Sequence, residues 1–184
     1  QSPKILNQGE KLWGTGISIN TNKEFINEFP IALLSDLSIY TRYGLSERSE
    51  NGFKISFSLP FLLTSYHYKY LLLQTAPVKS MKKPLLVSGD LGLSIGLVSS
   101  GSPAVGFHPT LLFGREDFYG GVSTNLIFPF PYLSSRIFAG ASMGNDKWKF
   151  NPEISYDTFS ILHGQTTIPK MIVAGFSIQR IFGE

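Results

Sequence analysis

The sequence predicts an all-β fold: an antiparallel, up-and-down β-barrel of about ten strands, with eight strands as the alternative. Two observations support this prediction. Apolar residues alternate with small or polar ones through most of the chain, and a period of two is typical of strands. Only 16% of the 184 residues are charged, while 18 glycines and 11 prolines supply frequent turn signals. This composition favours strands and turns over helices.

The first strand is expected near residues 11–20, where Trp13, Ile17 and Ile19 share one face and glycine or serine occupies the other. The next two strands form a hairpin around the turn sequence SERSEN. The strands after the first are expected near residues 35–45, 52–59, 65–72, 85–98, 103–114, 116–128, 132–143, 147–158 and 170–182. Two prolines, Pro109 and Pro152, fall inside strands, and because proline cannot donate to a ladder we expect bulges there.

The composition excludes several classes of site. The net charge of +3 is spread thinly, and the one basic cluster, residues 79–83, has no interleaved aromatic residues, so nucleic-acid binding is not expected. The chain has no cysteine, which excludes disulfides, thiolate zinc sites and cysteine nucleophiles. No apolar run approaches the roughly 18 residues of a membrane-spanning helix. No cofactor is expected.

Alternation alone does not say which face of a barrel meets the core, so three further features decide. The polar face is rich in glycine and serine, which suits a crowded lumen, and most strands match the length of a tilted transmembrane strand. Aromatic residues gather near strand ends, where membrane barrels carry interfacial girdles. The expected girdle residues are Trp13, Tyr43, Phe61, Phe128, Phe130, Tyr132 and Trp148. These features favour a transmembrane barrel; the alternative is a soluble β-sandwich or a lipocalin-like binder.

The expected domain organisation is a periplasmic N-terminal tether over residues 1–10 and an outer-membrane barrel over residues 11–184. An even number of strands places both termini on the same, periplasmic side. The longer connections, residues 20–29 and 159–169, then face outward, and most inner turns are short. Residues 75–84 form a longer inner connection that carries the basic cluster.

Two segments resemble known proteins. The run RYGLSERSENGFKISF resembles the strand, short turn and strand of many small bacterial outer-membrane β-barrel proteins, and SPKILNQGEKLWGTGIS is similar to the mature N-terminus of barrel lipoproteins. Together they cover about a third of the chain. The resemblance implies export, insertion into the outer membrane and acylation of a cysteine just before Gln1. The sequence departs from the lipoprotein pattern because it contains no such cysteine, and from the usual terminal aromatic of barrels because Gly183 and Glu184 follow Phe182.

Strand parity predicts a set of charged and titratable side chains inside the barrel. The set is Arg42, Lys54, His67, Lys69, Asp90, His108, Arg136, Lys149, Glu153 and Asp157. Buried charges must pair or meet water, and a barrel of about ten strands has little room beyond its side chains. We therefore expect a mutually paired, mostly plugged interior. The alternative is a narrow conduit that weakly prefers anions, because five basic groups exceed three acidic ones.

The sequence contains no motif for catalysis or metal binding. His67 and His108 are expected in the lumen and His163 in the last outer loop, but no serine is singled out as the nucleophile of a lipid hydrolase. No two histidines are four residues apart. The carboxylate clusters, Glu47 with Glu50 and Glu116 with Asp117, belong to turns, where solvated side chains are expected.

The function that these observations favour is that of an integral bacterial outer-membrane barrel. We expect a non-enzymatic structural or accessory subunit whose wall or outer loops dock onto a larger outer-membrane assembly. The expected partners are outer-membrane lipid, lipopolysaccharide and other outer-membrane proteins. A narrow channel for small anionic or hydrophobic solutes is the alternative, and a lipid-modifying enzyme that uses His67 or His108 is a third hypothesis.

Overall fold

The computed structural model describes residues 2–20, 34–58, 61–76, 83–98, 101–129, 132–162, 165–167 and 172–183. These residues form strands, turns and irregular segments. Among them, no helix is long and apolar enough to cross a membrane.

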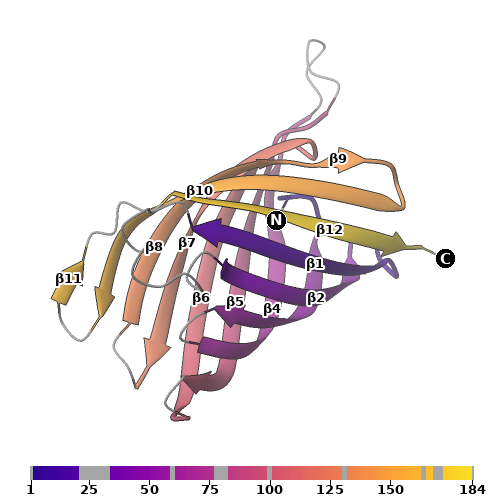
Figure 1. Ribbon diagram of the computed structural model, residues 1–184. Helices are drawn as coiled ribbons and strands as arrows, with labels where there is room; N and C mark the ends of the chain where they lie inside the picture. Colours follow the sequence, from indigo (N-terminus) through magenta and orange to yellow (C-terminus); the bar gives the residue numbers. More distant parts are fainter. Residues whose placement is uncertain are drawn as a thin grey trace.

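Ten long strands form a closed antiparallel barrel with up-and-down topology (Figure 1), which confirms the predicted fold class. The long strands are β1 Lys11–Asn20, β2 Leu34–Ser46, β3 Ser49–Ser58, β4 Phe61–Gln74, β5 Leu86–Val98, β6 Pro103–Gly114, β7 Phe118–Phe128, β8 Tyr132–Ala141, β10 Trp148–Leu162 and β12 Ile172–Phe182. From β1 to β8, each strand pairs with the next one along the chain. β8 then pairs with β10, β10 pairs with β12, and β12 closes the ring by pairing with β1. Two short strands, β9 Met143–Gly144 and β11 Gln165–Thr167, each pair with β10.

The alternation of the sequence separates the two faces of the barrel wall. In β3, Phe53, Ile55 and Phe57 are 55%, 55% and 43% exposed, whereas Gly52 and Lys54 lie on the opposite face. The same parity holds around the ring, so apolar side chains cover the outside and mostly small or polar ones line the inside. The pattern of residues 34–58 thus has its apolar face outward.

The expected bulges at the two prolines are wrong. Register shifts occur elsewhere, at Ser18/Ile19, Gly44/Ser46, Leu71/Leu73 and Asp157/Phe159. Pro109 lies where two residues of β6 have no partner on β7, and the register is the same on both sides of this gap. Pro152 lies on β10 between the residues that pair with β8 and those that pair with β9. Each proline therefore faces a gap in the pairing on one side and pairs in regular register on the other, Pro109 with Leu91 and Pro152 with Phe176, so no bulge is needed.

β1 begins and β12 ends at the same end of the barrel, which we call the terminal end; the opposite end is the loop end (Figure 1). The tight turns after β2, β6 and β9 are also at the terminal end, because each follows a strand that runs toward it. The predicted longer connections over residues 20–29 and 159–169, and most of the basic cluster, lie wholly or partly outside the described residues.

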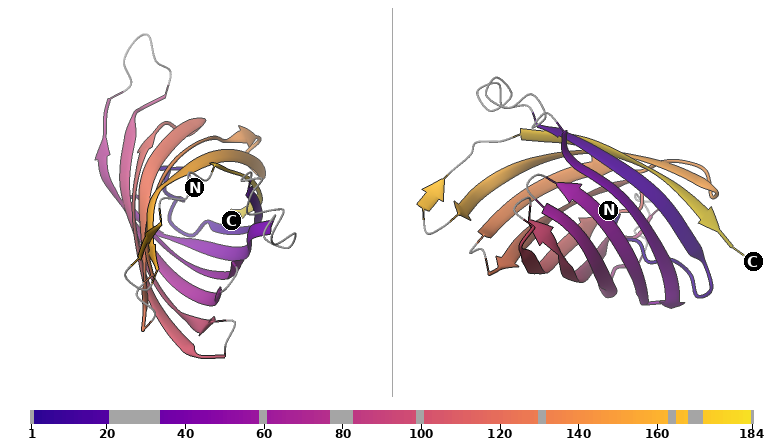
Figure 2. Two further views of the ribbon diagram at one scale, coloured as in Figure 1. Left: turned by 60° about the vertical axis from the view of Figure 1, so that its left-hand side comes forward. Right: turned by 60° about the horizontal axis from the view of Figure 1, so that its bottom comes forward.

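The expected tether is wrong for residues 2–6, because this segment folds back into the barrel, while residues 7–10 form a turn at its rim. Figure 2 (left) looks into the ring and shows the N-terminus inside it. Pro3, Ile5 and Leu6 are buried. Ile5 packs on Leu71 and Leu86, and Leu6 packs in a second cluster with Leu12 and Tyr40. Burial of these apolar side chains explains why the segment does not extend into solvent.

The prediction that Phe61 and Tyr132 belong to the outer aromatic girdle is wrong. Phe61 is only 7% exposed and packs inside the barrel with Leu63, Ala104 and Ile127. Tyr132 packs against this cluster, and its ring centroid lies 5.6 Å from that of Phe61. Both residues begin strands at the loop end, but their parity points them inward, so neither belongs to an outer aromatic girdle.

Candidate functional site

The terminal half of the lumen contains a buried cluster of three charges. The carboxylate of Glu50 contacts the guanidinium of Arg42 and lies 3.4 Å from Lys69 Nζ. Glu50 and Lys69 are each 1% exposed and Arg42 is 8% exposed. Asp90 is the cross-strand partner of Lys69 and is also buried. The cluster is therefore a closed network in which each cation faces a carboxylate.

The N-terminal segment is bound to this cluster through its main chain. Lys69 Nζ donates to the carbonyl oxygens of Ser2 and Lys4 at 2.6 and 2.7 Å. Ser88 Oγ donates to the carbonyl of Pro3 at 2.7 Å, and Glu50 Oε2 accepts the Leu6 N–H at 2.8 Å. Residues 2–6 are thus held inside the barrel by side chains from three different strands.

The expectation that Glu50 is a solvated turn residue is wrong. The β2–β3 turn consists of residues 47 and 48, so Glu50 already belongs to β3. Position 50 has the same parity as Lys54, which turns its carboxylate toward the lumen. Sequence parity could have found this residue, because the error lay only in where the turn was placed.

The middle of the lumen carries a hydrogen-bonded chain of three polar side chains. His108 Nδ1–H donates to Asn125 Oδ1 at 2.9 Å, which leaves His108 Nε2 to accept the Ser94 hydroxyl at 2.6 Å. A Cβ atom at Gly106 would contact Ser94 Oγ and lie 2.8 Å from His108 Nε2. The absence of a side chain at Gly106 therefore makes room for the imidazole.

His67 forms a second pair in the middle of the lumen, because its Nδ1 lies 3.2 Å from Asp90 Oδ1. A Cβ atom at Gly92 would lie 2.7 Å from His67 Cε1 and 3.2 Å from His108 Cβ. Gly92 thus accommodates both histidines across β5. The two predicted lumen histidines occupy neighbouring positions, and each has a polar partner.

The loop half of the lumen is hollow. A cavity of about 340 Å³ is lined by residues that include Lys54, His67, His108 and Arg136. A neighbouring cavity of about 200 Å³ shares four lining residues with it: Asp36, Lys54, Arg136 and Glu153. Charges here are paired, since Lys54 Nζ lies 3.2 Å from Asp36 Oδ2 and Arg136 Nε donates to Asp157 Oδ1 at 2.6 Å.

Lys149 and Glu116 lie toward the terminal end, with Lys149 Nζ 3.4 Å from Glu116 Oε1. Glu153, which lines both cavities, has its Oε2 3.5 Å from the Tyr119 hydroxyl. Lys4 also binds Glu116, at 3.0 Å. Burial alone raises the pKa of Glu116, but the hydrogen bond from Lys4 and the charges of the nearby lysines outweigh it and hold that pKa below its ordinary value.

The structure places all ten residues of the predicted charge network on the lumen side of the wall. It adds two carboxylates that were missed, Asp36 and Glu50. The inward-facing charges of the described strands are then five basic and five acidic residues: Arg42, Lys54, Lys69, Arg136 and Lys149, and Asp36, Glu50, Asp90, Glu153 and Asp157. The predicted excess of positive charge, and with it the basis for an anion preference, is wrong.

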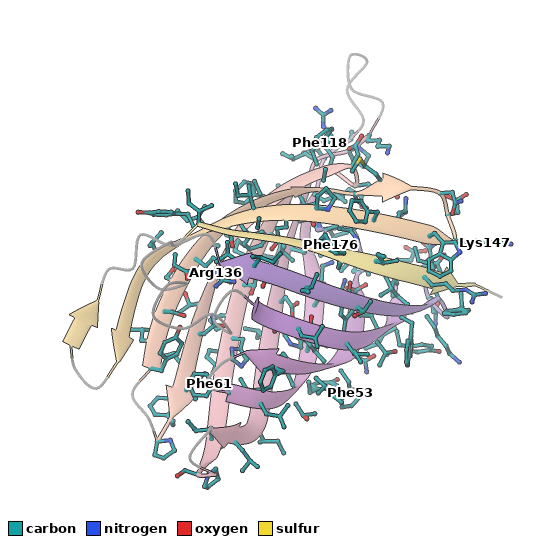
Figure 3. All side chains as sticks on the ribbon, in the orientation of Figure 1. Phe53, Phe61, Phe118, Arg136, Lys147 and Phe176 are labelled. Carbon is teal, nitrogen blue, oxygen red and sulfur yellow. The ribbon has the colours of Figure 1, made fainter. Side chains whose placement is uncertain are left out.

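Four of the expected girdle residues do lie on the outer wall. Trp13, Tyr43, Phe128 and Trp148 are 60%, 41%, 57% and 49% exposed. Figure 3 shows other outer-wall rings, among them Phe53 and Phe118, projecting away from the barrel. Phe130 and His163 lie outside the described residues. Among the residues that are described, no group of three or more histidine, aspartate or glutamate side chains is placed to hold a metal ion.

Comparison with known proteins identifies no family. No protein-family model matches the chain, and no curated protein matches it. Among solved structures, the chain is similar to the N-terminal β-barrel domain of OprF from Pseudomonas aeruginosa, with 12% sequence identity and a TM-score of 0.42. The alignment covers 96% of this chain and 100% of that one.

Proposed function

We propose that the protein is an integral barrel of the bacterial outer membrane, with a non-enzymatic structural or accessory role. The observation that carries this proposal is the polarity of the wall. Every long strand contributes large apolar side chains that are at least 37% exposed, whereas ionic pairs lie inside. An apolar surface that encircles a protein favours aggregation in water but matches the hydrocarbon core of a bilayer.

Cation–aromatic pairs on the outer wall support a membrane boundary at the terminal end. Lys11 lies 6.0 Å from the Tyr43 ring centroid, and Arg48 lies 5.9 Å from that of Tyr70. Arg180 lies 5.4 Å from the ring of Trp148 and 4.7 Å from that of Phe182. Aromatic and basic side chains are enriched where a bilayer meets water.

The accessory role is supported by the closed terminal half of the lumen and by its balanced charges. Short turns at the terminal end support placing both termini in the periplasm. In this proposal the barrel contacts phospholipid and lipopolysaccharide through its wall, and it docks onto other outer-membrane proteins through its wall or loops.

Membrane fractionation tests the first part of this proposal. We expect the protein in the outer-membrane fraction, extracted only by detergent; recovery as a soluble monomer without detergent would contradict membrane insertion. The second part predicts co-purification with a larger outer-membrane protein after mild extraction. Recovery solely as a lone barrel would count against an accessory role while leaving membrane insertion intact.

Acyl-ester hydrolysis is a second candidate function, favoured by one observation. Ser94 Oγ lies 2.6 Å from His108 Nε2, and His108 Nδ1 lies 2.9 Å from Asn125 Oδ1. In this arrangement the three side chains would serve as nucleophile, base and orienting amide. The 2% exposure of Ser94 weighs against it, because a substrate carbonyl cannot approach the hydroxyl without movement of its neighbours. A fluorophosphonate probe should label Ser94 and spare the Ser94→Ala variant if this function is present; an unlabelled wild-type protein excludes it.

A further inference from the structure

We propose that the terminal half of the lumen is a binding site for an extended peptide, that residues 2–6 fill it as a removable plug, and that the barrel without this plug conducts small polar solutes. The conducting part of this inference rests on the proposed insertion into a membrane. The peptide-binding part rests only on contacts inside the barrel.

The plug is bound as a ligand rather than as part of the sheet. Residues 2–6 belong to no strand, and the barrel recognises their main chain through side chains. Lys69 donates to two carbonyl groups, Ser88 donates to a third, and Glu50 accepts one N–H. Hydrogen bonds that involve a charged group are stronger than neutral ones, and here they are buried. Pro3 and Ile5 add buried apolar contacts.

A turn over residues 7–10 separates the plug from the barrel wall. Glu10 N–H donates to the carbonyl of Asn7 at 3.0 Å, and Gly9 has a positive φ of 86°. Two backbone hydrogen bonds fix the turn to Gly44 at the rim. Gly9 N–H donates to the Gly44 carbonyl at 3.1 Å, and Gly44 N–H donates to the Glu10 carbonyl at 3.0 Å. Residues 2–6 can therefore leave the lumen without disturbing β1, which begins at Lys11.

The size of the ring explains why a plug is present. Eight strands enclose an interior that side chains alone can fill, and the diameter grows with strand number. A ring of ten strands is wider, and in the terminal half the additional space is taken by residues 2–6. A remaining cavity of about 220 Å³ beside the plug is lined by Ser2 and Leu6 from the segment and by Arg42, Glu50 and Gln179 from the wall.

Removal of the plug would enlarge this cavity toward the cavities in the loop half of the lumen. The side chains along the route include apolar ones at the loop end, such as Phe61, Leu63 and Ile127, and a balanced set of five basic and five acidic groups. We therefore expect small polar solutes to pass with little preference between cations and anions. This expectation replaces the anion preference that was predicted from the sequence.

Binding in trans tests the peptide site without a membrane. A variant lacking residues 2–6 is folded in detergent, its folding is verified by circular dichroism, and it is titrated with a fluorescent peptide of sequence SPKILNQ. We expect saturable binding that unlabelled peptide displaces, and at least tenfold weaker binding to the same barrel carrying Lys69→Met, which lacks the ammonium donor. Absence of binding to the folded variant would overturn the peptide site.

Planar bilayers test the conduit. We expect the full chain to be silent, the truncated barrel to conduct, and added SPKILNQ peptide to close it. A truncated barrel that binds the peptide but inserts silently would overturn the conduit alone. Failure of both proteins to insert would instead contradict the proposed membrane function, while the detergent titration would still report on the peptide site.

A cysteine reporter covers the case in which the truncated chain does not fold. The chain has no cysteine, so Ile5→Cys introduces a single thiol in the plug. We expect slow reaction of this thiol with a bulky, water-soluble maleimide, and at least tenfold faster reaction when Glu50→Gln is added. Equal rates in both folded proteins would overturn the role of Glu50 in retaining the plug.

Discussion

Replacing Glu50 with glutamine should destabilise the barrel more than any other single loss of charge in the terminal half of the lumen. The substitution keeps the shape of the side chain and an oxygen that can accept the Leu6 N–H, but it removes the negative charge. Arg42 and Lys69 would then be two buried cations that share only the neighbouring Asp90. At 8% and 1% exposure, both are largely shielded from bulk water.

The expected magnitude follows from this burial. Removing one partner of a buried ion pair costs about 3–5 kcal/mol, because the remaining charge has neither water nor a counter-ion. A typical domain is stable by about 5–15 kcal/mol, so the loss is a large fraction of the total. Adding Lys69→Met removes one of the stranded cations, and the double variant should be less destabilised than the sum of the two single variants.

The assay is denaturant unfolding of the barrel in detergent micelles, followed by the fluorescence of Trp13 and Trp148. The matched control is Glu47→Gln, which removes the same charge three residues earlier on an exposed turn and should change stability by less than about 0.5 kcal/mol. If Glu50→Gln loses no more stability than this control, the buried charge network does not stabilise the fold.

Three other predictions address the wall, the lumen and pH. Leu93→Arg, at the middle of β5, should lower stability in bilayers by about 2–4 kcal/mol, whereas Phe118→Arg at a strand end should cost about 0–1 kcal/mol; equal costs would contradict the proposed orientation. Gly106→Ala should lower the free energy of unfolding by about 1–3 kcal/mol, because the added Cβ crowds Ser94 and His108. Gly89→Ala should be tolerated, because the nearest neighbour of its Cβ is 3.7 Å away. Unfolding curves of the two variants that show equal stability would contradict this prediction. The pKa of Glu116 is depressed in the folded state, so the stabilising effect of this carboxylate is complete above the ordinary glutamate pKa and is lost as pH falls through the folded value. Acid should therefore increase labelling of the Ile5→Cys thiol in the plug. Adding Glu116→Gln should remove part of that pH dependence.

The period of two in the sequence was sufficient to predict ten antiparallel strands and the inward direction of all ten residues in the charge network. This success has a local cause: parity along a strand alternates from residue to residue whatever the rest of the chain does. Where the prediction failed for Glu50 and Phe61, the parity was correct and the error lay in where strands were taken to begin. Tyr132 begins β8 where the strand was predicted to begin, and its shared parity with Arg136 already placed it inside the barrel. A turn and the first residues of a strand carry the same kinds of side chain, so their boundary is poorly marked.

The contents of the lumen depended on contacts between residues far apart in the sequence. Lys69 is 67 residues from Ser2, and Ser88 is 85 residues from Pro3. Residues 2–10 alternate too weakly to show that they enter the barrel, and nothing within them marks Lys69 or Glu50 as partners. Periodicity thus determined the wall, because each position depends on its immediate neighbours. Closure of the ring determined the plug and the cavities, because these exist only when ten strands surround one space.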